Sequence, residues 1–104
     1  MIKGLGPDAP IATNERGGQQ SASPYGFHLM DARAMFRLAE VLAYGAKRYK
    51  RDNWRLIDTE DHINHALQHI YGWIAGDKQD DHLGHAFCRL MMAIGTERED
   101  SEKE

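Results

Sequence analysis

Two seven-residue segments repeat the same arrangement of acidic, imidazole and apolar side chains. Residues 61–67 read DHINHAL and residues 81–87 read DHLGHAF, so each copy places an Asp and two His before an Ala and a large apolar residue. Because positions three and seven apart share one face of a helix, each copy predicts a polar stripe. Packed antiparallel, two such helices would form a groove rich in imidazole and carboxylate groups. The stripes are His62, His65 and His69 in one helix and His82, His85 and Arg89 in the other.

This groove has two interpretations. It is a reaction or binding site, because titratable groups with altered properties gather at such sites. Alternatively, the two short strings are alike by chance and the histidines form the solvated flanks of two helices, since structural networks hold the same groups. The repeat alone does not decide between them.

A second group of residues combines cations with aromatic rings. Residues 47–55 read KRYKRDNWR, in which basic side chains surround Tyr49, Asn53 and Trp54. Cations suit phosphate, aromatic faces suit a base and the Asn amide can read a base edge, so this segment suits a nucleotide. The alternative is a solvated basic helix end, with Trp54 or Tyr49 packed into the core. The basic residues are Lys47, Arg48, Lys50, Arg51 and Arg55.

Helical periodicity predicts the elements that position both groups. Apolar residues recur at helical spacing over residues 31–49, 59–75 and 81–98. Asp31 and Thr59 are expected to cap the first two helices. The His faces should border the core without belonging to it. The stripes expected to be buried are Ile63, Leu67, Ile70 and Ile74 in the second helix and Leu83, Phe87, Leu90 and Ile94 in the third.

The expected fold is therefore all-α, a small bundle of three principal helices after an irregular N-terminal arm. Residues 1–28 are assigned to the arm, because they are rich in glycine and contain all three prolines. Residues 29–98 form the helical domain, and residues 99–104 form a charged, frayed tail. No run of alternating β-branched residues predicts a strand.

Composition narrows the class of protein further. A chain of 104 residues supports one domain with a modest core, which favours a homo-oligomer, most simply a dimer. Its net charge of −3 argues against stable binding to nucleic acid. The single cysteine, Cys88, and the lack of a long apolar stretch predict a cytoplasmic protein without membrane association. The apolar residues expected at the oligomer contact are Met30, Phe36, Met91 and Met92.

The order of these segments resembles a known family. The strings GAKRYKRDNWR, HALQHIYGWIAGD and DHLGHA are similar to motifs of the phage-type dATP/dGTP diphosphohydrolase N-terminal domain family. That family is itself distantly like the MazG-type all-α nucleoside triphosphate pyrophosphohydrolases. The resemblance implies conversion of a purine deoxynucleoside triphosphate to its monophosphate and pyrophosphate, in the host cytoplasm if the chain is phage-encoded. The matching positions are Lys47, Tyr49, Asn53, Trp54, Arg55, His69, Gly76, Asp77, Asp80, His82 and His85.

The resemblance also implies a Mg²⁺ site and a set of roles, with Mn²⁺ as an alternative ion. MazG-type enzymes hold Mg²⁺ with clustered carboxylates, and a water on the ion could attack the substrate. A histidine near its ordinary pKa suits a general base, and the basic segment suits phosphate. The expected residues are Asp77, Asp80, His65 and His85 for catalysis; Lys47, Tyr49, Arg51, Asn53, Trp54, Arg55 and His69 for substrate; and Asp61, Asp77, Asp80, Asp81 and His82 for the metal.

Two other functions fit the same residues. In the first, the imidazoles bind a transition metal such as Zn²⁺, Mn²⁺ or Fe²⁺, as in a metal phosphohydrolase. In the second, the chain is a non-catalytic helical phage protein that binds a nucleotide or another protein. The metal ligands of the first alternative would be His62, His65, His82 and His85 with Asp61 or Asp81.

Overall fold

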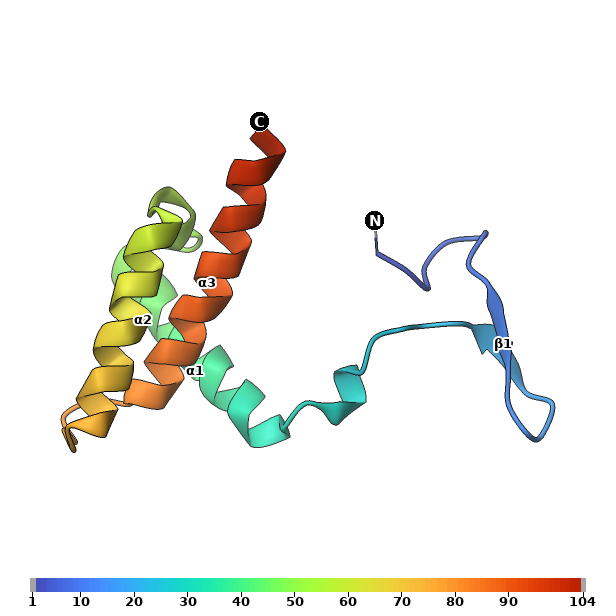
Figure 1. The fold of residues 1–104 in the computed structure, drawn as a ribbon, viewed down its shortest axis with the longest axis horizontal. Coiled ribbons are helices and arrows are strands. Elements are labelled where there is room, and N and C mark those ends of the chain that lie inside the picture. The colour runs from blue at the N-terminus through green and yellow to red at the C-terminus, as the bar shows by residue number, and fades with distance from the viewer. Residues whose placement is uncertain (1, 104) are drawn as a thin grey trace. The chain divides into compact units, whose positions relative to one another are not determined.

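The structure, a computed structural model, describes residues 2–103, with the side chains of residues 2–97. The chain divides between Met30 and Asp31 into two compact units. Within the described residues, no helix is both long enough and apolar enough to cross a membrane. Three α-helices dominate the second unit, which confirms the expected fold class (Figure 1). The helices are α1, Ala32–Tyr49; α2, Thr59–Ile74; and α3, His82–Lys103, with two short 3-10 helices, η1, Phe27–Leu29, and η2, Asn53–Leu56.

The first unit contains a short antiparallel hairpin, so the expectation that no strand would form is wrong. Strand β1, Ile11–Thr13, pairs with β2, Gln19–Ser21. The turn between them is built by Asn14, whose Oδ1 accepts hydrogen bonds from the backbone N–H groups of Arg16 at 3.0 Å and Gly18 at 2.8 Å. A local side-chain bond of this kind shapes the turn, and three-residue strands leave too short a pattern to read as alternation.

The α1 helix begins as expected, and the other two helices differ at their ends. The Asp31 carboxylate accepts a hydrogen bond from the Ala34 N–H at 2.9 Å, which caps α1. The expected Thr59 cap is wrong, because Asp58 occupies the N-cap position and makes no side-chain capping bond. The Thr59 hydroxyl instead lies 2.7 Å from the Thr96 hydroxyl and joins α2 to α3. The third helix continues to Lys103, past the expected end at residue 98.

Helices α2 and α3 pack side by side, and α1 packs against α3 (Figure 1). The two helices of the hairpin are antiparallel, because the Thr59 to Thr96 contact joins the start of one to a late turn of the other. An ion pair between Arg37 and Asp81 fastens α1 to the start of α3. The second unit is therefore a hairpin of α2 and α3 with α1 on one side.

The faces that α2 and α3 turn toward each other differ from those expected. His62 has no exposed surface and Ala66 is 1% exposed, whereas Ile74 on the expected core stripe is 63% exposed. On α3, Ala86 and Ala93 are buried while Ile94 is exposed. The expected burial is therefore wrong for seven of the eight stripe residues. The expected position of the His faces at the border of the core is wrong for His62, which is buried, whereas His65 is exposed and the other histidines of the stripes are half-buried. Small alanines let the two backbones approach, and the buried imidazole finds hydrogen-bond partners there.

Candidate functional site

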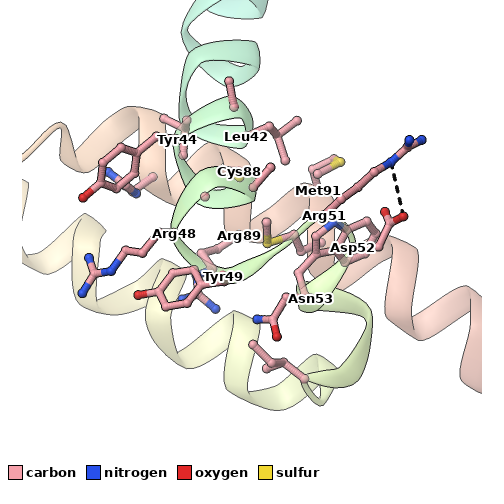
Figure 2. Close-up of a pocket in the computed structure, with 18 of the residues that line it drawn as sticks. Leu42, Tyr44, Arg48, Tyr49, Arg51, Asp52, Asn53, Cys88, Arg89 and Met91 are labelled. Carbon is pink, nitrogen blue, oxygen red and sulfur yellow. Dashed lines mark ion pairs between the residues drawn. The ribbon is translucent and has the colours of Figure 1, made fainter.

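A pocket with a volume of about 840 Å³ lies between the C-terminal half of α1, the connection that follows it, and α3 (Figure 2). This volume falls within the range of small-molecule sites. Leu42, Cys88 and Met91 lie on one side of the pocket, and Tyr49 and Asn53 lie on another (Figure 2). The pocket therefore offers an apolar wall beside a wall with an aromatic ring and an amide.

Most of the basic and aromatic segment lines this pocket, and two of its expected ligands do not. Tyr49, Arg51, Asn53 and Trp54 line it, together with Arg48 and Lys50. Lys47 is exposed and is not part of the lining. Arg55 is also outside the lining, and its guanidinium lies 4.3 Å from the centre of the Trp54 ring.

The connection after α1 has an unusual backbone at the pocket. Lys50 has φ 89° and Asp52 has φ 62°, a region that residues with a side chain rarely occupy. Each such residue costs roughly 1–3 kcal/mol, and strain of this kind concentrates at functional sites. Arg51 and Asp52 form an ion pair, with 3.6 Å between Nε of Arg51 and Oδ2 of Asp52 (Figure 2). The strained connection thus holds an Asp and two cations at the pocket wall.

Trp54 serves both interpretations of the basic segment. It lines the pocket and is half-buried. The same ring lies against α3, because a Cβ added at Gly95 would come within 3.0 Å of it. The structure therefore uses this tryptophan both as packing and as pocket wall.

A chain of three polar side chains joins the end of α2 to the start of α3. His82 Nε2 lies 2.6 Å from Asp77 Oδ2, and His82 Nδ1 lies 3.0 Å from His69 Nδ1. The hydrogen bond from His82 is the main cause that lowers the pKa of Asp77, against the opposing effect of desolvation. Asp77 is therefore an ionised acceptor that orients the His82 ring.

His85 stacks on His69 of this hydrogen-bonded series, and both histidines line the pocket. The rings of His69 and His85 are 5.0 Å apart and nearly parallel, at 17°. His85 Nε2 lies 3.3 Å from Asp80 Oδ1. Burial lowers the pKa of His69, and so does the neighbouring His85, while Asp80 acts in the opposite direction. Since His69, Asp80 and His85 all line the pocket, a neutral imidazole stands in its wall.

Arg89 reaches the pocket from the hairpin core, a role that was not expected from its place in the polar stripe. It lines the pocket, and its guanidinium donates to Nδ1 of the buried His62 at 3.1 Å. Nε2 of His62 in turn donates to the Trp54 carbonyl at 2.9 Å. A guanidinium only donates and a carbonyl only accepts, so these contacts assign the His62 proton to Nε2. Both nitrogens of His62 are thus engaged in structural bonds.

The residues expected to share a metal ion are not gathered together. Asp61 lies near the start of α2, and roughly 20 Å of helix separates it from Asp77 at about 1.5 Å per residue. Asp81 pairs with Arg37, which together with the Gly84 N–H lowers its pKa. His65 is exposed and is not part of the pocket lining. Over the residues that the structure describes, no three His, Cys, Asp or Glu side chains are placed to hold one ion.

The fold and the pocket together define a small helical domain with a pocket that is lined by aromatic rings and cations. The chain belongs to the family described as dATP/dGTP diphosphohydrolase, N-terminal, whose sequence model matches residues 14–104. This match covers the pocket and the histidine cluster, and it confirms the family resemblance. No curated protein and no solved structure matches the chain.

Proposed function

We propose that this domain binds a purine deoxynucleoside triphosphate in the pocket and hydrolyses it to the monophosphate and pyrophosphate. The observation that carries the proposal is the meeting of the two sequence groups in one pocket, with Tyr49, Asn53 and Trp54 from one and His69 and His85 from the other. The family description supplies the substrate class.

The two walls of the pocket suit the two halves of such a substrate. Tyr49 and Trp54 offer aromatic faces for a base, and the Asn53 amide offers a donor and an acceptor for its edge. Arg48, Arg51 and Arg89 line the same space and are the groups assigned to the phosphates. Lys47 and Arg55, outside the lining, have no assigned contact with the substrate.

The histidine chain gives His69 the role of general base. When both imidazoles are neutral, the bond to Asp77 places the His82 proton on Nε2. His82 Nδ1 then accepts the proton of His69 Nδ1, which leaves the lone pair of His69 on Nε2. Because the pKa of His69 is lowered, His69 itself is neutral at neutral pH. His69 replaces His65 and His85 as the assigned base.

The reaction follows from these positions. A water attacks the α-phosphorus, its proton passes to His69 Nε2, and the bond from the α-phosphorus to the bridging oxygen breaks as pyrophosphate leaves. The arginines of the pocket neutralise the charge that grows on the leaving group, which is the largest requirement of phosphate transfer. Asp80 and His85 act as positioning residues, because His85 stacks on His69, the general base, and Asp80 contacts His85.

The described residues of one chain do not provide the cluster of ligands that the expected divalent metal requires. Asp77 is engaged by His82 and Asp81 is engaged by Arg37. Asp80 is left in the pocket with His85 as its neighbour. The steps above therefore use only the side chains of this chain, and the assay measures metal dependence directly.

The test is hydrolysis of each deoxynucleoside triphosphate by the purified protein, alone and with Mg²⁺, Mn²⁺ or Zn²⁺. Products are separated by ion-exchange chromatography, and binding is followed in parallel by thermal shift. We expect the monophosphate and pyrophosphate from dATP or dGTP. Asp80→Asn should lower turnover by up to about a hundredfold through misplacement of the histidine pair.

Asp58→Asn is the matched control, because Asp58 makes no side-chain capping bond and is not part of the pocket lining. Turnover should be the same as in the parent. Equal turnover in Asp80→Asn and Asp58→Asn would show that Asp80 does not position the histidine pair. Nucleotide-dependent stabilisation without hydrolysis under any metal would reduce the function to nucleotide binding, and the absence of both would end the proposal.

A further inference from the structure

The hairpin of α2 and α3 carries two uncovered apolar stripes with identical spacing. Both stripes advance along the chain by four, three and four residues, the spacing at which helices pack knobs into holes in bundles. No charged residue stands at any of the eight positions. The stripes are Ile63, Leu67, Ile70 and Ile74 on α2 and Leu83, Phe87, Leu90 and Ile94 on α3.

Both stripes face the same side of the hairpin. On α2, Ile63 and Leu67 each follow a buried residue by one position; on α3, Phe87 and Ile94 do the same after Ala86 and Ala93. One residue turns the side chain by about 100° around the axis. Because the two helices are antiparallel, the same offset turns both stripes toward a single face of the pair.

This face lies away from α1 and from the pocket. Met92, which lines the pocket together with residues of α1, and Leu90 are two positions apart on α3, or roughly 200° around the helix. None of the eight stripe residues lines the pocket. The face is therefore separate from the site of the proposed function, and its role does not depend on that function.

The exposed area of the face is close to what one partner contributes to a stable dimer. Seven of the eight residues are between 37% and 68% exposed. With about 200 Å² for a fully exposed large side chain, they present roughly 700 Å², against about 800 Å² per partner in a standard interface. A patch of this size exceeds the largest apolar patch of a typical monomer, roughly 300–600 Å².

We propose that this face binds the same face of a second copy of the chain, so that two hairpins form a four-helix bundle. A second copy fits because it offers the same pair of stripes at the same spacing, and an isologous contact matches a patch with itself. The contact residues differ from those expected from composition. Phe36 lies on α1 and Met91 lines the pocket, whereas the proposed interface lies on the other side of the hairpin.

The test is the mass of the full chain in solution, measured by light scattering during size-exclusion chromatography at tens of micromolar. The parent should have twice the chain mass of 11.8 kDa. Leu67→Lys and Leu90→Lys should each give the monomer mass with helical circular dichroism retained. Phe36→Lys is the matched control, because Phe36 is a large apolar residue, 70% exposed, on α1; it should stay dimeric.

The thermal midpoint of the parent supplies a measurement that needs no variant. It should rise with protein concentration, since dimerisation stabilises the folded chain by mass action. A monomeric parent with a concentration-independent midpoint overturns the proposal, because a second copy then does not bind the apolar face. Loss of the dimer in Phe36→Lys together with its persistence in Leu67→Lys overturns it as well and moves the contact to α1.

Discussion

Nδ1 of His62 lies 3.1 Å from the guanidinium of Arg89, and this contact connects the centre of the hairpin to the wall of the pocket. His62 is the largest fully buried side chain in the part of the chain that the structure describes. Arg89 is half-buried and lines the pocket. The imidazole therefore fixes a cation that the proposed function assigns to phosphate, and it does so from a buried position outside the pocket lining.

His62→Ala should lower the free energy of unfolding by about 3 kcal/mol, because it opens a cavity and leaves the Trp54 carbonyl and Arg89 without a partner. Urea unfolding measures the change. His65→Ala is the control, since His65 is exposed on the same helix, and it should change stability by no more than about 0.5 kcal/mol. Equal stability of the two variants would contradict the buried role of His62.

Gly72→Ala should destabilise the domain by about 1–3 kcal/mol through crowding of His82. A Cβ at Gly72 would lie 2.9 Å from Cε1 of the His82 ring, which two hydrogen bonds hold in place. Gly45→Ala should have the opposite sign. Its Cβ would meet nothing within 4 Å, so the helix gains up to about 1 kcal/mol. Thermal unfolding of both variants provides the comparison, and a stabilised Gly72→Ala protein would refute the crowding.

The sequence predicts the three helices well because helical periodicity and the Asp31 cap are local signals. The sequence does not correctly predict which faces of α2 and α3 are buried. Apolar stripes such as Ile63 to Ile74 predict the core when one chain is considered alone, yet here Ala66 and His62 fill the contact between α2 and α3. Hydropathy ranks alanine and histidine below isoleucine, whereas close packing of two helices favours small side chains and paired polar groups.

The pocket shows a similar division between local and tertiary information. Tyr49, Asn53 and Trp54 could be singled out because cations and rings alternate along a short segment, and all three line the pocket. Arg89 could not, because its role depends on a contact across the hairpin with His62. The expected metal set rests on the family resemblance, and a resemblance between motifs does not reveal that Asp81 faces Arg37.

Asp77→Asn should remove a stabilising contribution that depends on pH. The pKa of Asp77 in the folded protein is lowered from its ordinary 3.8, chiefly by the hydrogen bond from His82. A lowered folded pKa means that the contribution is complete above 3.8 and is lost as the pH falls from there through the folded value. The difference in unfolding free energy between parent and variant should therefore be largest near neutral pH and shrink below 3.8. A constant difference down to the acid transition would show that the carboxylate charge has no part in it.

The pH dependence of turnover should identify His69 as the base. Because burial and His85 lower the pKa of His69, turnover at saturating substrate should fall on the acid side only below its ordinary value of 6.5. His69→Gln removes the lone pair and should lower turnover by about a hundredfold or more. Gln68→Ala, an exposed neighbour on α2, should keep both the rate and the acid limb of the parent. If His69→Gln retains turnover with an unchanged acid limb, the proton passes to another group and the chain from Asp77 through His82 is structural.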